Sequence, residues 1–403
     1  MTQLGVWATR RARFAFIRRD VRGVEAPLAS ATKDGVFLRT DLDFAVWNPD
    51  SDISNYKLVE PHDFVIGLRS FQHGISHSAV KGIVSPAYTV LRAVPELEPR
   101  YYKHYFRSSL LISQLANITQ GIRQGQAIDI EAFQNLDVPT PPFEEQQRIA
   151  DFLDAETARI GHIERRISSL FSLLGERQSA TLSACFDGHS LAGRDSLVVP
   201  LRRVVKTWID YRGATPEKTS SGIPLVTAKN IRDGKVDLDA SREYISANSY
   251  DSWMRRGLPR PGDVLLTTEA PLGQVAMVKD SNVALAQRVI LLRADQSAIS
   301  PNWLYWYLRS PQAQGELELR ATGSTALGIK ADRLRGVPIP ILGTDEMSRR
   351  VQELEERVKQ VEQLKRPLLR QLDLLIERRT ALITAAVTGQ IDVSTASGRG
   401  IED

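Results

Sequence analysis

The chain has 403 residues, enough for two or three domains with buried cores. Its 42% hydrophobic and 25% charged residues are ordinary for a soluble protein, and no apolar run reaches the roughly 18 residues that a membrane span needs. The net charge of +4 permits a nucleic-acid partner without requiring one. The single cysteine, Cys185, excludes an internal disulfide and favours a reducing cytoplasm.

Residues 1–140 are predicted to form a mixed globule, which we call the first globule. Short β-branched or aromatic runs at 35–38, 64–68 and 88–91 are bounded by turn-forming residues and indicate strands. A helix is expected over 100–115. Its three tyrosines and one phenylalanine repeat at helical spacing, so we expect a core role rather than stacking on bases. They are Tyr101, Tyr102, Tyr105 and Phe106.

A long helix is predicted to follow over 141–186. Prolines precede an acidic first turn, which suits the positive end of a helix dipole. Apolar residues then recur at alternating four- and three-residue steps, a coiled-coil pattern interrupted by Glu156. At about 1.5 Å per residue, roughly 40 residues would span about 60 Å. The apolar positions are Ile149, Leu153, Ile160, Ile163, Ile167, Leu170 and Leu174.

The same plan recurs about 200 residues later, which indicates a tandem duplication. A second long helix is expected over 341–388, interrupted by Lys365 and Arg379 and kinked at Pro367. The second globule, 187–340 with a linker at 187–198, repeats the turn at Asp63 as a turn at Asp263. Residues 389–403 form a tail. Loop 68–74 differs in sequence from its counterpart 267–273, which predicts one recognition fold with two targets.

No catalytic, cofactor or metal motif is complete. The nearest string to a methyltransferase base-holding loop, 48–50, lacks its second proline and its aromatic ring, and the glycine-spaced stretch 188–195 lacks the lysine of a P-loop. Asp233-Gly234-Lys235 with Glu217 could suggest a nuclease, but this tripeptide is typical of a turn. His73 and His77 have no acidic or thiol companion for zinc. We therefore expect a protein that is not an enzyme and has no cofactor.

The sequence resembles the specificity subunits of type I restriction-modification systems. The resemblance rests on Val138-Pro139-Thr140-Pro141-Pro142-Phe143-Glu144-Glu145-Gln146-Gln147-Arg148-Ile149, on its counterpart from Val337, and on the exit Thr380-Ala381-Leu382-Ile383-Thr384-Ala385-Ala386-Val387-Thr388-Gly389. It implies an α+β fold in which two pseudo-symmetric α/β target-recognition domains are separated by two long antiparallel coiled-coil helices. It also implies partners: double-stranded DNA with a split target, two methyltransferase subunits, and restriction subunits in a larger complex.

Each globule would gain affinity from phosphates and specificity from base edges. An arginine-rich opening segment from Arg10 to Arg22 favours phosphate contact, with solubility as the alternative. Long polar side chains in the variable loops favour base contact, although such residues are often merely solvated. The predicted DNA-binding residues are Arg22, Arg69, Gln72, His73, Arg123, Arg212, Lys229, Asn230, Thr268, Glu269, Gln274, Ser324 and Thr325.

Two further expectations concern the long helices. They would act as a ruler that sets the gap between two half-sites, and charged residues on their outer faces would bind the methyltransferase. The positions chosen for that surface are Arg148, Glu164, Arg165, Glu355, Lys359 and Glu362. The alternative to DNA recognition is a non-catalytic scaffold that binds other proteins through its two globules.

Overall fold

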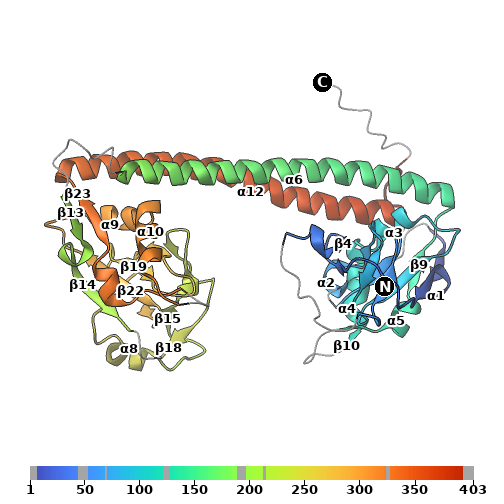
Figure 1. The fold of residues 1–403 in the computed structure, drawn as a ribbon, viewed down its shortest axis with the longest axis horizontal. Helices are drawn as coiled ribbons and strands as arrows, with labels where there is room; N and C mark the ends of the chain where they lie inside the picture. Colours follow the sequence, from blue (N-terminus) through green and yellow to red (C-terminus); the bar gives the residue numbers. More distant parts are fainter. Residues whose placement is uncertain are drawn as a thin grey trace, which may run out of the picture. The chain divides into compact units, whose positions relative to one another are not determined.

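A computed structural model describes residues 7–43, 53–68, 70–120, 127–187, 197–211, 215–323 and 327–393. The chain divides into two compact units, Met1–Ser168 with Leu368–Asp403, and Ser169–Pro367. Each unit contains one globule and part of both long helices, α6 (Phe143–Phe186) and α12 (Thr344–Val387) (Figure 1). The expected α+β class, with two globular domains and two long helices, is confirmed.

The first globule is built around an antiparallel four-stranded sheet, ordered β2-β9-β6-β7. Smaller two-stranded pairs and short helices surround it. The sheet strands are β2 (Phe16–Arg19), β9 (Thr89–Ala93), β6 (Phe64–Ile66) and β7 (Ser76–His77). The pairs are β1 (Thr9–Arg11) with β12 (Asp137–Pro139), β3 (Ala29–Ala31) with β4 (Val36–Leu38), β5 (Lys57–Val59) with β8 (Gly82–Val84), and β10 (Thr119–Gln120) with β11 (Ala127–Ile128). The helices are α1 (Ala12–Ala15), η1 (Arg39–Asp41), α2 (Ser70–His73), α3 (Pro99–Tyr105), α4 (Ser109–Asn117) and α5 (Ile130–Gln134).

The second globule has a four-stranded sheet with the corresponding order, β14-β22-β19-β20. These strands are β14 (Val205–Asp210), β22 (Val289–Ala294), β19 (Val264–Thr267) and β20 (Val275–Met277). Around them lie β13 (Leu197–Pro200) with β23 (Pro338–Ile341), β16 (Ile231–Arg232) with β17 (Lys235–Val236), and β15 (Ile223–Val226) between β18 (Tyr244–Ile245) and β21 (Ala284–Leu285). The helices are η2 (Leu201–Arg203), η3 (Ala228–Asn230), α8 (Ala247–Trp253), α9 (Pro301–Leu308), α10 (Pro311–Arg320) and α11 (Ala331–Arg335).

The helix expected over 100–115 is two helices, α3 and α4. The first helix ends at Tyr105, and Ser108 caps the second, because its hydroxyl accepts the backbone N–H of Leu111. Ser310 does the same for Ala313 between α9 and α10. The expected core role of Tyr101, Tyr102, Tyr105 and Phe106 is confirmed, since all four are fully buried.

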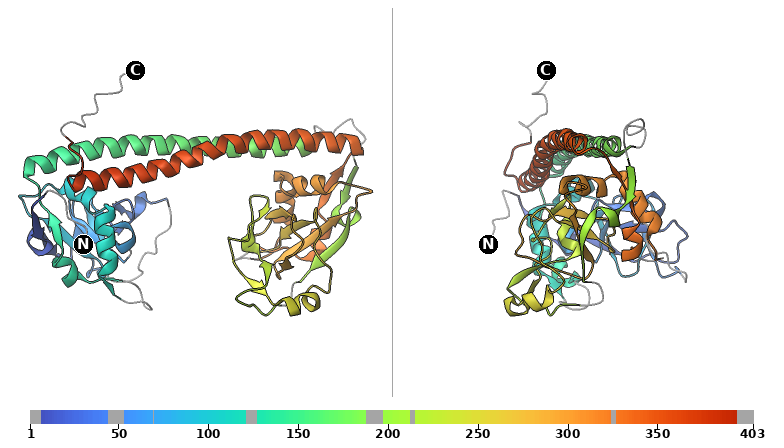
Figure 2. Two further views of the ribbon diagram at one scale, coloured as in Figure 1. Left: turned by 180° about the vertical axis from the view of Figure 1, so that it is seen from behind. Right: turned by 90° about the vertical axis from the view of Figure 1, so that its left-hand side faces the viewer.

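In each unit α6 and α12 lie side by side and run antiparallel (Figure 2). Each helix has 44 residues, and α12 continues unbroken through Pro367. The predicted apolar seam of α6 is only partly correct. Ile149, Leu153, Ile160 and Ile167 are buried, whereas Ile163 and Leu170 are 37% and 46% exposed. A single partner helix covers only a narrow strip of the α6 surface, so Ile163 and Leu170, which lie beside that strip, remain exposed.

Candidate nucleic-acid interface

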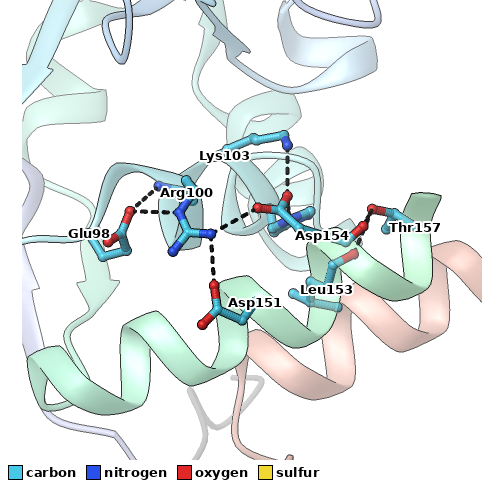
Figure 3. Close-up of polar contacts among 8 residues, drawn as sticks. Glu98, Arg100, Lys103, Asp151, Leu153, Asp154 and Thr157 are labelled. Carbon is cyan, nitrogen blue, oxygen red and sulfur yellow. Dashed lines mark hydrogen bonds and ion pairs between the residues drawn. The ribbon is translucent and has the colours of Figure 1, made fainter. Parts of the chain in front are cut away.

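Helix α3 of the first globule is held on α6 by the carboxylate of Asp154 (Figure 3). Lys103 Nζ lies 2.8 Å and His104 Nε2 2.9 Å from Asp154 Oδ1. Arg100 extends the contact, with Nη1 2.8 Å from Asp151 Oδ1 and 3.4 Å from Asp154 Oδ2. The globule is therefore fixed on the long helix by several charge-assisted hydrogen bonds to neighbouring carboxylates.

The protonation states at this contact follow from burial and charge. Burial alone would raise the pKa of Asp154, but the hydrogen bonds from His104 and Lys103 outweigh it and hold the pKa well below its ordinary value. Burial lowers the pKa of His104 more than its bond to Asp154 raises it. This shift favours the neutral form of His104, so Lys103 and Arg100 supply most of the positive charge at this contact.

The second globule repeats this contact with different side chains. Glu355 of α12 accepts Trp306 Nε1–H at 3.0 Å and Asn302 Nδ2–H at 3.1 Å, both from α9. Trp306 and His104 stand at equivalent places in their helices. Glu355 therefore helps to position the second globule, although its side chain stays exposed. Glu164 pairs with Arg379, with 2.8 Å between Oε2 and Nη2. The methyltransferase surface remains a prediction.

Each globule also contacts the C-terminal end of the other long helix, α12 for the first globule and α6 for the second. Tyr101 donates its hydroxyl to the carbonyl of Val387 at 2.9 Å, within the first unit. In the second unit the ring of Phe186 packs edge-on against Trp303 and Tyr307, with centroids 4.7 and 5.4 Å away. Each globule is thus anchored to the start of one long helix and the end of the other.

The variable loop of the first globule exposes the residues expected to read bases. Gln72 and His73 lie in the short helix α2, and both side chains are exposed. Arg107 Nη1 donates to the carbonyl of His73 at 2.8 Å, which fixes the end of this loop. Beside it is a hollow of about 710 Å³, lined by the β3–β4 hairpin, by Phe37 and by His73.

Other predicted DNA contacts lie at the surface, and some of them already form ion pairs within the chain. Arg22 is exposed and donates to Asp20, with Nε to Oδ1 at 2.7 Å. Lys229 is exposed at the second globule, and Gln274 is half-buried. Glu269 faces Arg288, with 3.0 Å between Oε1 and Nε. These residues remain predictions as DNA contacts.

Two predicted contacts are internal, and we withdraw them. Asn230 is fully buried: its Oδ1 accepts the backbone N–H of Thr227 at 2.9 Å, and its Nδ2 donates to the carbonyls of Asp237 and Ser241. It completes a capping box and has no free polar atom for a base. Thr268 is 1% exposed, and its backbone pairs with Arg288 and Ile329.

Several predictions fall on residues that the structure does not describe. They are Arg69, Arg123, Arg212, Ser324 and Thr325, together with the strings 48–50 and 188–195. Among the described residues no group of three His, Cys, Asp or Glu side chains could hold a metal ion, and no helix could cross a membrane. The Asp233-Gly234 pair forms a turn between β16 and β17, as the sequence indicated.

Comparisons with known proteins agree with this architecture. The family model described as the type I restriction modification DNA specificity domain matches residues 63–170. The EcoBI specificity subunit of Escherichia coli is 24% identical over 336 residues, covering 76% of this chain and 67% of that protein. The EcoKI specificity subunit of Escherichia coli strain K12 is 22% identical over 358 residues, covering 81% and 74%. These matches indicate a specificity subunit of a type I restriction-modification system.

The fold of this specificity subunit also matches a solved chain. In a structure of complex assembly and conformational transition in a type I restriction-modification system, one chain aligns with a TM-score of 0.68 at 20% identity, covering 96% of this chain and 98% of that one. As a specificity subunit, the protein is the recognition component and not the catalytic one. A subunit of this kind is not expected to carry complete catalytic motifs, and none was found in the sequence.

Proposed function

We propose that this subunit reads a bipartite sequence in double-stranded DNA, one half with each globule, and brings methyltransferase and restriction subunits to it. The observation that supports the proposal is that the two globules share one scaffold but have different surface loops. Both globules have the same sheet order and the same type of contact with a long helix, whereas loops 68–74 and 267–273 share almost no residues. Two equivalent frames with different loops suit two different half-sites.

The division of labour along the chain follows from this proposal. Residues 1–140 and 187–340 would be the target-recognition domains, 141–186 and 341–388 the spacer helices, and 389–403 a tail. Two methyltransferase subunits would bind, one for each half-site, and the complex would work in the cytoplasm with its DNA. Among the described residues, Gln72, His73, Lys229 and Gln274 are our preferred contacts because their side chains reach the surface.

A genome-wide methylation map tests the proposal. Cells expressing the partner methyltransferase are compared with and without this chain. We expect one split motif, with two specified halves around a fixed gap, to be methylated only when the chain is present. Identical maps, together with retained binding between the chain and the methyltransferase, would favour the protein-interaction scaffold instead.

A further inference from the structure

The β16–β17 hairpin of the second globule presents three cations on one short segment. Its turn, Asp233-Gly234, has positive φ at both residues, 48° and 80°, which matches the twist of a tight hairpin. Arg232 lies directly opposite Lys235, and Ile231 opposite Val236. Ile231 is buried, so the alternation of strand side chains sends Arg232 and Lys235 outward, and Lys229 is exposed just before the hairpin.

These cations are not neutralised within the described part of the chain. None of Lys229, Arg232 and Lys235 forms an ion pair with a described residue, and the Nε of Arg232 donates only to the carbonyl of Lys229, at 3.0 Å. Like charges directly opposite each other on paired strands are destabilising. An anion bound between Arg232 and Lys235 would relieve this repulsion, whereas no ion pair with a described residue does.

The hairpin is held rigidly by α9. Tyr305 donates its hydroxyl to the carbonyl of Gly234 at 3.1 Å, and a Cβ at Gly234 would lie 2.2 Å from that hydroxyl oxygen. Arg309 lies over the rings of Tyr305 and Trp306, with its Cζ 5.1 and 4.8 Å from the ring centroids. A preorganised cationic turn loses little conformational entropy when it binds a ligand.

The first globule has a hairpin at the equivalent place. Arg107, which corresponds to Arg309, donates to the carbonyl of Lys33 in the turn between β3 and β4. Each hairpin also bridges the edge of its four-stranded sheet, through Val36 to Ser78 and through Gly234 to Ala276. In the first hairpin, the cross-strand pair that faces outward is Ser30 and Phe37, whereas in the second it is Arg232 and Lys235. The frame is shared, and the cationic surface is specific to the second globule.

We propose that Lys229, Arg232 and Lys235 bind the phosphate backbone of the DNA half-site read by the second globule. This inference rests on the proposed function. It adds Arg232 and Lys235, which the loop pattern did not indicate, and it assigns the contact already expected of Lys229 to a phosphate. Exposed cations of this kind supply affinity and salt dependence, not sequence choice. The duplex phosphates would lie over the outward face of the hairpin, and base reading would remain with the neighbouring loops.

The test uses the complex of full-length chain and methyltransferase subunits on a duplex that carries the mapped split motif, with a scrambled duplex beside it. The double variant R232A/K235A should bind both duplexes about tenfold or more weakly at physiological salt, and the slope of log affinity against log salt should shrink by about two. R232K/K235R, which keeps both charges, should bind like wild type.

The matched control is R260A/K279A. It removes two exposed charges from the same globule, at the turn beside Pro301, where α9 begins, whereas the hairpin lies at the other end of α9. The control should leave the salt slope unchanged. Equal slopes for R232A/K235A and wild type, with matching thermal melts, would overturn the hairpin proposal. If the wild-type complex does not distinguish the two duplexes, the proposed function itself fails.

Discussion

Arg293 donates two parallel hydrogen bonds to Asp263, from Nε to Oδ1 at 2.8 Å and from Nη2 to Oδ2 at 2.7 Å. Asp263 is 2% exposed and also accepts the backbone N–H of Arg260 at 2.8 Å. In the first globule Asp63 makes the equivalent contacts, with Arg92 Nε at 2.7 Å and the backbone N–H of Glu60 at 2.9 Å. One buried carboxylate therefore fixes the turn before the central strand in both copies.

We predict that Asp263→Asn destabilises the second globule by about 2–3 kcal/mol, because Arg293 loses its charge partner in a largely buried setting. Urea unfolding of the chain measures this. The control is Asp239→Asn, which breaks an exposed pair with Arg242 and should cost under about 0.5 kcal/mol. Equal losses in the two variants would contradict a structural role for Asp263.

The sequence predicted the duplication and the matching turns at Asp63 and Asp263, because repeats and turn residues are local signals. It did not predict Arg92 and Arg293 as partners, since pairing across a sheet depends on tertiary register. The contact between His104 and Asp154 was also missed: both residues are ordinary polar positions until α3 lies on α6. Asn230 shows the opposite error. A polar residue in a loop was expected to be exposed, but it satisfies backbone groups in the interior.

His77 should make the stability of the first globule depend on pH. Burial, reinforced by the charge of His62, lowers the pKa of His77 to about 4; Lys103 and His104 act in the same direction and Asp154 opposes them. The unfolded chain takes up this proton near pH 6.5, so between about pH 6.5 and 4 the unfolded state binds more protons. Stability should therefore fall by about 3 kcal/mol as the pH drops through this window.

His77→Phe removes that titration. The ring already packs beside Phe64, at 5.4 Å between centroids, and its buried Nε2 makes no hydrogen bond with a described residue. We expect the variant to keep more of its stability at pH 4.5 than wild type does, in urea melts measured at both pH 7 and pH 4.5. Parallel pH profiles for the two proteins would refute this assignment.

Polar pairs on the seam of the long helices should fix their register. Glu164 pairs with Arg379 in one unit and Gln178 with Lys365 in the other, both at 2.8 Å. The same two heptads separate the members on each helix, so one antiparallel register satisfies both pairs. E164R should destabilise the first unit by about 1 kcal/mol, and E164R/R379E should recover most of it. A thermal-melt double-mutant cycle measures the coupling, and additive losses would rule it out.

Gln72 and Gln274 offer a paired test of the two reading surfaces. Gln72→Ala should relax one base position in the half-site of the first globule, by about 1–3 kcal/mol of discrimination, because a lost bidentate contact no longer separates adenine from other bases. Gln274→Ala should affect only the other half-site. Methylation maps of both variants provide the readout, and a change in both halves from either substitution would show that the globules do not read independently.

The ruler expectation leads to a prediction about the gap between half-sites. Seven residues inserted in α6 between Glu164 and Gln178, and seven in α12 between Lys365 and Arg379, would preserve both polar pairs and extend each helix by about 10 Å. At about 3.4 Å per base pair, the methylated motif should acquire a gap longer by about three base pairs, with both half-sites unchanged. Insertion into α6 alone breaks the common register and should abolish methylation. A normal gap in the double insertion would show that the long helices do not set the spacing.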